Sequence, residues 1–239
     1  MTTNTAPLAL VAGGSSAAGT AVAAALVSAG LRVVTVGSDA GRIGAAAART
    51  GGAVPLVCDL ADPAAASALA ETVHRDHGAV SGLIHLVGGW RGGRDLAAQT
   101  DADWDFLHRS VLTTLRNTTR AFYDDVAASP AGRIAIVSST AVTAPTPGDA
   151  NYATIKAAAE TWVRALAAGL DPDAGPAAVV LVVKALVDDA MRAAAPNRKF
   201  PGFTDVTDLG QAVSELFSTP AAQLNGARIV LNQKASSDH

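Results

Sequence analysis

Apolar residues along this chain gather in short runs, and longer helical stretches separate the runs. The runs are rich in Val, Leu and Ile and lie at 8–12, 31–36, 53–57, 82–87, 133–137, 177–183 and 227–231. The alanine-rich stretches between them predict helices at 17–29, 41–50, 62–77, 102–127, 150–170 and 207–218, two of which we expect Asp101 and Thr207 to cap. The runs are apolar throughout rather than at every second position, which indicates strands buried on both faces. The alternation therefore predicts a parallel sheet with helices on both sides.

Composition points to one domain and to small-molecule chemistry. Half of the 239 residues are apolar and 16% are charged, and no linker-like stretch divides the chain, so we expect a single domain over residues 1–239. The net charge of -3 comes from scattered groups, which favours neither nucleic acid nor a membrane as a partner. The N-terminus has no basic region ahead of an apolar core, and no long apolar run is uninterrupted. The single cysteine, Cys58, cannot form an internal disulfide, and a cytoplasmic location is expected.

A glycine-rich segment, Ala12 to Gly19, joins the first run to the first predicted helix. Glycines at such a position let the backbone turn sharply and approach a pyrophosphate, whose charge is stabilised by the free N–H groups of the helix N-terminus. A tight turn without a ligand gives the same pattern. The segment is therefore a hypothesis for a nucleotide site.

Ser139, Tyr152 and Lys156 carry the candidate chemistry. Tyr152 and Lys156 are four residues apart and share one helix face, so the lysine ammonium is expected to favour the phenolate and lower the pKa of Tyr152. That suits a general acid or base at a carbonyl oxygen. Ser139 ends the fifth run, at the edge where parallel sheets bind ligands, and can hydrogen-bond the same oxygen. The alternative is a half-buried tyrosine and a solvated lysine.

Together these motifs resemble the short-chain dehydrogenase/reductase family over nearly the whole chain. The resemblance implies a Rossmann-like, doubly wound α/β fold with a parallel sheet of about seven strands. It implies an NAD(P)-dependent oxidoreductase that transfers hydride between a nicotinamide cofactor and a small carbonyl, alcohol or imine-like substrate, with Ser139, Tyr152 and Lys156 as the catalytic set. The same resemblance implies that the cofactor is held by Tyr152 and Lys156 together with Gly13, Ser15, Ser16, Ala17, Gly19, Ser38, Asp59, Leu60, Val87 and Gly88. It also implies a homodimer or homotetramer built on helices 102–127 and 150–170.

The chain departs from the family pattern at several positions. Ala17 takes the place of a loop glycine, and His85-Leu86-Val87-Gly88 that of Asn-Asn-Ala-Gly. Val111 replaces the Asn that holds a relay water. Lys184, Ala185 and Asp189 align with residues that hold the nicotinamide carboxamide. An alternative hypothesis is therefore a degenerate member that binds a nucleotide or small molecule for regulation or catalyses a non-redox step.

Part of this divergence resembles the dihydropteridine reductase branch of the family. The segment "VGGWRGG", Val87 to Gly93, and the missing relay Asn carry that similarity. Trp90 lies in this segment, where its indole either stacks on a flat ring or closes the edge of the core. His85, at the end of the fourth run, is either a hydrogen-bonded core residue or a catalytic one.

The end of the second run bears on the choice of cofactor. An acid there bonds the ribose hydroxyls of NAD(H), and this chain has Gly37 and Ser38 instead, with Arg42 close by. We therefore expect NADP(H) rather than NAD(H), although the carboxylate of Asp39 favours NAD(H).

Two further stretches carry residues typical of binding sites. His74 and His77 have a metal-like spacing but no third ligand, so they are expected to be solvated and no metal is predicted. The polar segment 188–205 lies where the family keeps its substrate lid, and its Arg192, Arg198 and Lys199 suggest an anionic substrate.

Overall fold

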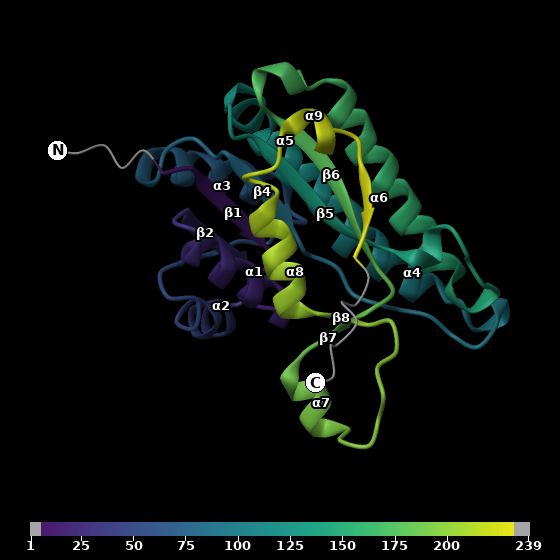
Figure 1. Cartoon of the computed structure of the whole chain (residues 1–239). Coiled ribbons are helices and arrows are strands. Elements are labelled where there is room, and N and C mark those ends of the chain that lie inside the picture. The colour runs from purple at the N-terminus through teal and green to yellow at the C-terminus, as the bar shows by residue number, and fades with distance from the viewer. Residues whose placement is uncertain (1–5, 232–239) are drawn as a thin grey trace.

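The central layer of the molecule is a parallel sheet. The computed structural model describes residues 6–231, and the sheet has seven strands in the order β3-β2-β1-β4-β5-β6-β9 (Figure 1). Its strands are β1 (Leu8–Ala12), β2 (Arg32–Gly37), β3 (Val54–Val57), β4 (Gly82–His85), β5 (Arg133–Ser139), β6 (Ala177–Val183) and β9 (Arg228–Val230). The strand order reverses between β1 and β4, which is the switch point at which doubly wound sheets bind ligands. The predicted fold class is confirmed.

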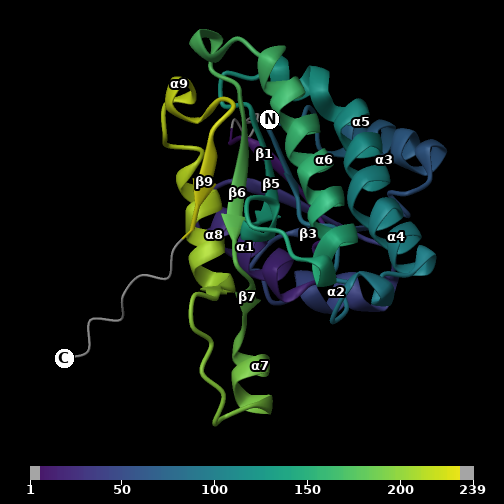
Figure 2. The ribbon, with the colours of Figure 1, turned by 90° about the vertical axis from the view of Figure 1, so that its right-hand side faces the viewer.

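Helices cover both faces of the sheet. They are α1 (Ala17–Ser28), α2 (Ala40–Ala47), α3 (Pro63–Asp76), α4 (Asp101–Leu107), α5 (Thr114–Ala128), α6 (Ala150–Ala168), α7 (Asp189–Ala194), α8 (Val206–Glu215) and α9 (Ala221–Leu224). One apolar core lies between the sheet and α3, α5 and α6, and a second lies between the sheet and α1 and α8. Figure 2 shows α8 on one side of β6 and α6 on the other. Both faces of β1 and β6 are buried, which explains their uninterrupted apolar sequences.

The helix predicted over 102–127 is interrupted. It consists of α4, a π-helical stretch at His108–Thr113, and α5. Thr114 lies at the junction, where its hydroxyl donates to the carbonyl of Ser110 at 2.7 Å and lies 3.0 Å from His85 Nε2 of β4. Such a bulge widens the helix by one residue and is frequent at functional sites.

Two predicted helix caps were placed wrongly. Thr100 caps α4, because its hydroxyl accepts from the N–H of Asp103 at 3.1 Å, and Asp205 caps α8. In each case the residue immediately before the helix has a side-chain oxygen that reaches the free N–H groups of the first turn. The expected caps, Asp101 and Thr207, lie inside their helices.

A separate lobe follows β6. Two short strands, β7 (Leu186–Val187) and β8 (Thr204–Asp205), pair with each other, and α7 lies in the segment that they bracket. In Figures 1 and 2 this lobe extends beyond the carboxyl end of the sheet, in the region predicted as a lid.

Two basic residues of the lobe, Arg192 and Arg198, have partners within it. Arg192 pairs with Asp205 at 2.9 Å, and the guanidinium of Arg198 lies 5.1 Å from the ring centroid of Phe200. This weakens the suggestion of an anionic substrate, since two of its three bases already have partners. Among residues 6–231 no helix is both long and apolar enough to cross a bilayer.

Candidate active site

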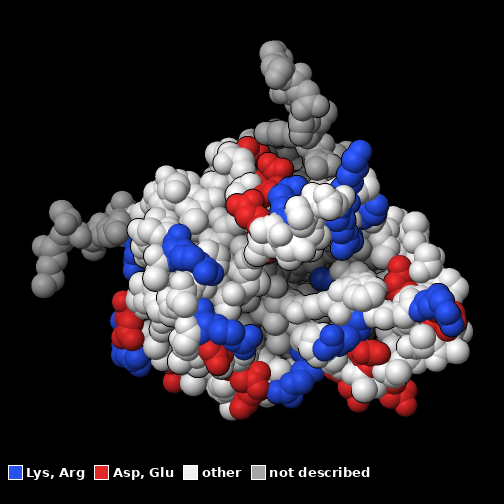
Figure 3. All heavy atoms as spheres, turned by 90° about the horizontal axis from the view of Figure 1, so that it is seen from below, with Lys and Arg blue, Asp and Glu red and all other residues white. Residues whose placement is uncertain are grey.

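Two adjoining cavities lie at the carboxyl ends of the strands. One, of about 630 Å³, is lined by Tyr152 and is called here the Tyr152 cavity. The other, of about 480 Å³, is lined by Gly13 and is called the Gly13 cavity. Leu86, Val87 and Gly88 line both cavities, so the segment that leaves β4 forms their shared wall. Figure 3 shows this face of the molecule hollowed beneath the lobe, with a largely uncharged surface inside and Lys and Arg side chains on the rim.

The glycine segment forms a close-packed wall. Gly13 has a φ of 87°, and a Cβ there would lie 2.8 Å from the carbonyl carbon of Leu86. A Cβ on Gly19 would lie 2.3 Å from the carbonyl oxygen of Gly13. Ser16 caps α1 by accepting from the N–H of Gly19 at 2.9 Å. The sequence needs glycine at 13 because the loop passes against the backbone that follows β4, and at 19 because the first turn of α1 packs on the loop itself.

The start of α1 lies between the two cavities. Ser15 and Ser16 line the Gly13 cavity, and Ala18 lines the Tyr152 cavity. An elongated ligand that occupies both cavities therefore passes the N-terminus of a twelve-residue helix, where backbone N–H groups favour a phosphate. The arrangement fits a dinucleotide.

The far end of the Gly13 cavity contains charged groups. Asp59 Oδ2 accepts from Arg109 Nη2 at 2.8 Å, and Asp59 Oδ1 accepts from the N–H of Ala61 at 2.9 Å. Arg42 also lines the cavity, with its Nε 3.7 Å from Asp39 Oδ1 and its side chain 72% exposed. Both guanidinium groups lie on exposed ion pairs, which cost little to rearrange around a ligand.

Most of the predicted cofactor-binding residues line these cavities. The Gly13 cavity includes Gly13, Ser15, Ser16, Ser38, Asp59, Leu60, Val87 and Gly88. Ala17 and Gly19 line neither cavity: Ala17 is exposed on the first turn of α1, and Gly19 is buried beneath the loop. Sequence reasoning missed Cys58, Phe106, Arg109, Ser110 and Thr114, three of which come from the π-helical stretch and its junction with α5. No periodicity signals that bulge.

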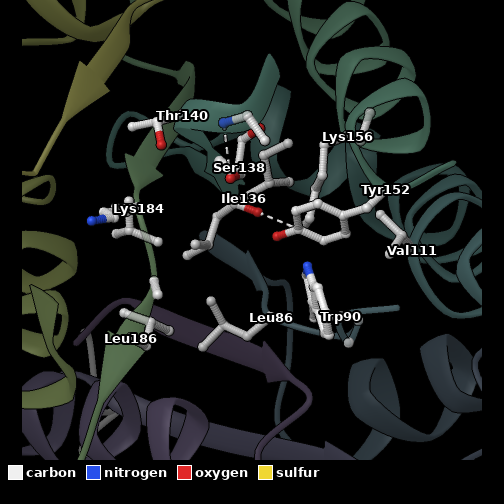
Figure 4. Close-up of a pocket in the computed structure, with 18 of the residues that line it drawn as sticks. Leu86, Trp90, Val111, Ile136, Ser138, Thr140, Tyr152, Lys156, Lys184 and Leu186 are labelled. Carbon is white, nitrogen blue, oxygen red and sulfur yellow. Dashed lines mark hydrogen bonds between the residues drawn. The ribbon is translucent and has the colours of Figure 1, made fainter. Parts of the chain in front are cut away.

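Ser139, Tyr152 and Lys156 lie together in the Tyr152 cavity. Ser139 is the last residue of β5, and Tyr152 and Lys156 occupy successive turns of α6. Figure 4 shows the phenol oxygen of Tyr152 pointing into the cavity, with Lys156 behind the ring. The alternative of a solvated lysine is wrong, because Lys156 is only 9% exposed.

The pKa of Tyr152 is raised rather than lowered. Burial of the phenol is the main cause and the nearby Asp149 carboxylate adds to it, while the Ser139 hydroxyl acts in the opposite direction. The expected lowering of this pKa is therefore wrong for the protein alone, because burial, which disfavours the charged phenolate, sets the direction of the shift. Tyr152 is a neutral phenol at neutral pH and has a proton to donate.

Lys156 is held by the strand beside it. Its Nζ donates to the carbonyl oxygen of Val137 at 2.9 Å and lies 5.7 Å from the ring centroid of Tyr152. Burial lowers the pKa of Lys156 to about 8, although the Glu160 carboxylate acts to raise it. The side chain is therefore mainly an ammonium at neutral pH and loses its charge as the pH rises through about 8.

The departures from the family pattern leave the centre of the cavity free of added charge. Lys184 lines the Tyr152 cavity, but its Nζ donates to the carbonyl of Pro201 in the lobe at 3.2 Å, and Figure 4 shows it directed away from Tyr152. Asp189 is exposed at the start of α7 and lines neither cavity. Val111 presents an apolar side chain, 3% exposed, beside the cavity.

Trp90 is held at the cavity by the glycines around it. A Cβ on Gly92 would lie 2.6 Å from the Trp90 ring, and the N–H of Gly93 donates to the carbonyl of Gly148 at 2.7 Å. Gly89 packs on Phe106 in the same way. Trp90 lines the cavity and is nevertheless 63% exposed, so it does not close the core edge. Its exposed ring is available to a ligand.

Two of the histidines, His85 and His74, have side-chain partners. His85 is buried against Thr114, and burial, with the nearby Lys156 charge, lowers its pKa to about 3, so it is neutral and hydrogen-bonded. His74 Nε2 lies 2.6 Å from Asp125 Oδ2, so it is not simply solvated.

Comparison with known sequences identifies relatives. The family model described as short chain dehydrogenase matches residues 7–199. A short chain dehydrogenase of Pseudocercospora fijiensis is 32% identical over 168 residues, which are 68% of this chain and 54% of that protein, so this chain spans about half of its length. The 3-oxoacyl-(acyl-carrier-protein) reductase FabG of Salmonella typhimurium is 26% identical over 235 residues, 95% of this chain and 88% of that one.

Solved structures show the same fold. The apo short chain oxidoreductase of Pseudomonas aeruginosa with an atypical catalytic centre superposes with a TM-score of 0.84 at 22% identity, over 98% of both chains. Its NADPH-bound form gives a TM-score of 0.81 over the same shares. No finding bears on the dihydropteridine reductase branch, which stays a prediction.

Proposed function

This chain belongs to the short-chain dehydrogenase family of oxidoreductases, and from that membership and the two joined cavities we propose that it is an NADPH-dependent reductase of small carbonyl or imine-like compounds. One observation carries the proposal: Ser139, Tyr152 and Lys156 line a cavity that adjoins the glycine-walled cavity at Leu86–Gly88. A ligand lying across both cavities places one end beside Tyr152.

The residues present fit a nicotinamide dinucleotide. The turn at Gly13, where a Cβ would meet the backbone of Leu86, and the start of α1 suit the pyrophosphate. Ser38, Arg42 and Asp59 would hold the adenosine end, and Leu86 to Gly88 lie between the adenosine and the reacting end. When bound, the cofactor supplies a hydride to the substrate carbon.

Tyr152 is the general acid of the proposed reaction. Its raised pKa keeps the proton on the phenol until negative charge develops on the carbonyl oxygen or imine nitrogen of the substrate, and that atom then takes the proton. The Ser139 hydroxyl, at the end of β5, donates a hydrogen bond to the same atom. The Lys156 ammonium stabilises the phenolate that remains. A phenol that is protonated at neutral pH is in the form that reduction requires.

Two arginines of the Gly13 cavity favour NADP(H) over NAD(H). Arg42 and Arg109 line the adenosine end, and Gly37 leaves the position of the selecting acid without a carboxylate. The NADPH-bound structure of the Pseudomonas aeruginosa oxidoreductase is consistent with this choice.

We expect Arg42→Ala to weaken NADPH binding by about tenfold and to leave NADH binding unchanged, because a charge-assisted contact to a 2′-phosphate contributes about 1.5–3 kcal/mol. Calorimetric titration of each cofactor measures this. Arg49→Ala, an exposed base outside the cavity, is the matched control. Equal loss of affinity for both cofactors would contradict a phosphate contact.

The Tyr152 cavity suits an apolar, flat substrate. Its lining includes the apolar side chains of Trp90, Ala144, Leu186, Met191 and Phe203. Tyr152 and Ser139 line the same cavity, so a compound with one polar carbonyl or imine on a ring or chain matches the lining.

We expect Trp90→Ala to raise the KM of a flat carbonyl substrate by about tenfold with little change in NADPH affinity, since loss of an aromatic stacking partner costs about 1–1.5 kcal/mol. Steady-state kinetics with an aromatic and an acyclic ketone measures it. Trp104→Ala removes an indole that lines neither cavity and serves as the control. A KM that stays constant in Trp90→Ala for the aromatic ketone would show that the ring has no contact with substrate.

The function itself is tested by titrating the purified protein with NADPH and NADH and then measuring NADPH consumption with a panel of ketones and imines. Micromolar binding with turnover supports the proposal. Binding without turnover on the panel favours the non-redox or regulatory alternative. The proposed homodimer or homotetramer is tested by light scattering.

A further inference from the structure

A buried carboxylate lies one turn beyond Lys156, and the proposed chemistry does not use it. Glu160 of α6 is 5% exposed. Its Oε1 accepts from Ser138 Oγ at 2.6 Å, and its Oε2 accepts from Arg228 Nε at 3.0 Å. Arg228 comes from β9, at the edge of the sheet, and its Nη2 also donates to the carbonyl of Ser139 at 3.3 Å. Each carboxylate oxygen therefore has a partner on a different strand.

These contacts converge on the end of β5. Three successive residues of that strand are each held by a polar side chain: Lys156 bonds the carbonyl of Val137, Glu160 the hydroxyl of Ser138, and Arg228 the carbonyl of Ser139. Lys156 and Glu160 belong to the helix that carries Tyr152. The contacts therefore fix where α6 lies along β5, and with it the placement of the phenol relative to the Ser139 hydroxyl.

An apolar pair would fill this space at a lower desolvation cost. Replacing a buried ion pair by well-packed apolar residues is often neutral or stabilising, so a buried Glu–Arg pair is weak support for stability alone. Its hydrogen bonds are directional, and they end on the strand that carries the reacting serine. A role in placing that strand accounts for them better than packing does.

We propose that Glu160 and Arg228 are positioning residues, which lock the end of β5 onto α6 and so hold Ser139, Tyr152 and Lys156 in one arrangement. The proposal rests on the proposed reductase function. Glu160 also acts on Lys156 by charge. The groups that face Lys156 are Tyr152 and Glu160 of its own helix and the neutral His85 of β4, with Arg228 beyond Glu160. Of these, the Glu160 carboxylate is the group that raises the pKa of Lys156.

The test compares Glu160→Gln, which keeps the shape and removes the charge, with Arg228→Lys, which keeps the charge. We expect Glu160→Gln to lower kcat by about 10- to 100-fold with the KM for NADPH nearly unchanged, because small misplacements of reacting groups cost this much. The alkaline limb of the pH–rate profile should move to lower pH. Arg228→Lys should retain most of the wild-type kcat.

A matched control separates positioning from stability. Asn225→Ala removes two hydrogen bonds at the far end of α6, to the N–H of Ala178 and the carbonyl of Ala167. We expect it to lower the melting temperature at constant kcat and unchanged pH profile. If Glu160→Gln keeps the wild-type kcat and profile, or loses no more than Asn225→Ala, the proposal fails.

Labelling of Lys156 with an amine-reactive reagent across pH, read by peptide mass spectrometry, needs no turnover. Glu160→Gln should make Lys156 react at lower pH than in the wild type. An unchanged labelling profile overturns the positioning role even if the protein reduces carbonyls. Conversely, if the wild-type protein turns over no substrate but Glu160→Gln still shifts the labelling of Lys156, the reductase function is contradicted and the Glu160–Arg228 arrangement remains supported.

Discussion

Removing the hydroxyl of Tyr152 is expected to lower NADPH-dependent turnover by about 10²- to 10⁴-fold, the range that general acid catalysis contributes. In Tyr152→Phe the buried ring keeps its packing, but no proton is available to the developing oxyanion. The Kd for NADPH should stay within about twofold, since the hydroxyl is directed into the cavity where the substrate binds. Steady-state kinetics and calorimetric titration on the same preparation measure both quantities.

Tyr123→Phe is the matched control. The Tyr123 hydroxyl donates to the carbonyl of Leu166 between α5 and α6, outside both cavities. It should cost some stability and no turnover. A Tyr152→Phe protein that consumes NADPH at the wild-type rate would remove Tyr152 from the mechanism and, with it, the present assignment of the acid.

Replacing Lys156 by methionine is expected to separate activity from stability. Turnover should fall by about 100-fold or more, because no cation remains to stabilise the phenolate. The melting temperature at neutral pH should stay the same or rise, since burial lowers the pKa of Lys156 from 10.5 to about 8 and the folded state therefore disfavours the ammonium. Methionine fills a similar volume without a charge.

The stability difference between Lys156→Met and the wild type should change with pH. Below about pH 8 the lysine is charged in both the folded and the unfolded chain, and the cost of burying the ammonium is present in full. As the pH rises from about 8 to 10.5 that cost disappears, so the stability advantage of Lys156→Met should narrow over this interval. Thermal melts at pH 7 and pH 10 measure it. A mutant that melts well below the wild type at pH 7 would show that the lysine contributes more by bonding Val137 than it loses by burial.

The sequence was sufficient for the sheet and for the place of the reacting residues. Strands buried on both faces read as apolar runs, so β1, β5 and β6 were located to within two residues at either end. A glycine that close backbone contact requires, such as Gly13, can also be recognised in the sequence. Residues that depend on local hydrogen bonds were harder to place. The caps at Thr100 and Asp205 and the short strands β7 and β8 lack a periodic signal.

The electrostatics of the site could not be predicted from spacing. Tyr152 and Lys156 are one helical turn apart, which suggested a lowered phenol pKa. In the structure both side chains are buried. Desolvation therefore raises the pKa of Tyr152 and lowers that of Lys156. Glu160 is likewise one turn beyond Lys156, but its partners, Ser138 and Arg228, are 22 and 68 residues away in the chain. No local pattern connects residues so far apart.

The π-helical stretch at His108–Thr113 shows how this segment takes up one extra residue. A π turn closes with an i→i+5 hydrogen bond in place of the i→i+4 bond of an α-helix, so the helices α4 and α5 on either side keep their winding. Loss of a single residue from the stretch would restore ordinary α-helical winding and remove the bulge, which carries Arg109 and Ser110 of the Gly13 cavity. Homologues that are one residue shorter here are therefore expected to keep the direction of α4 and to differ in the wall of the Gly13 cavity.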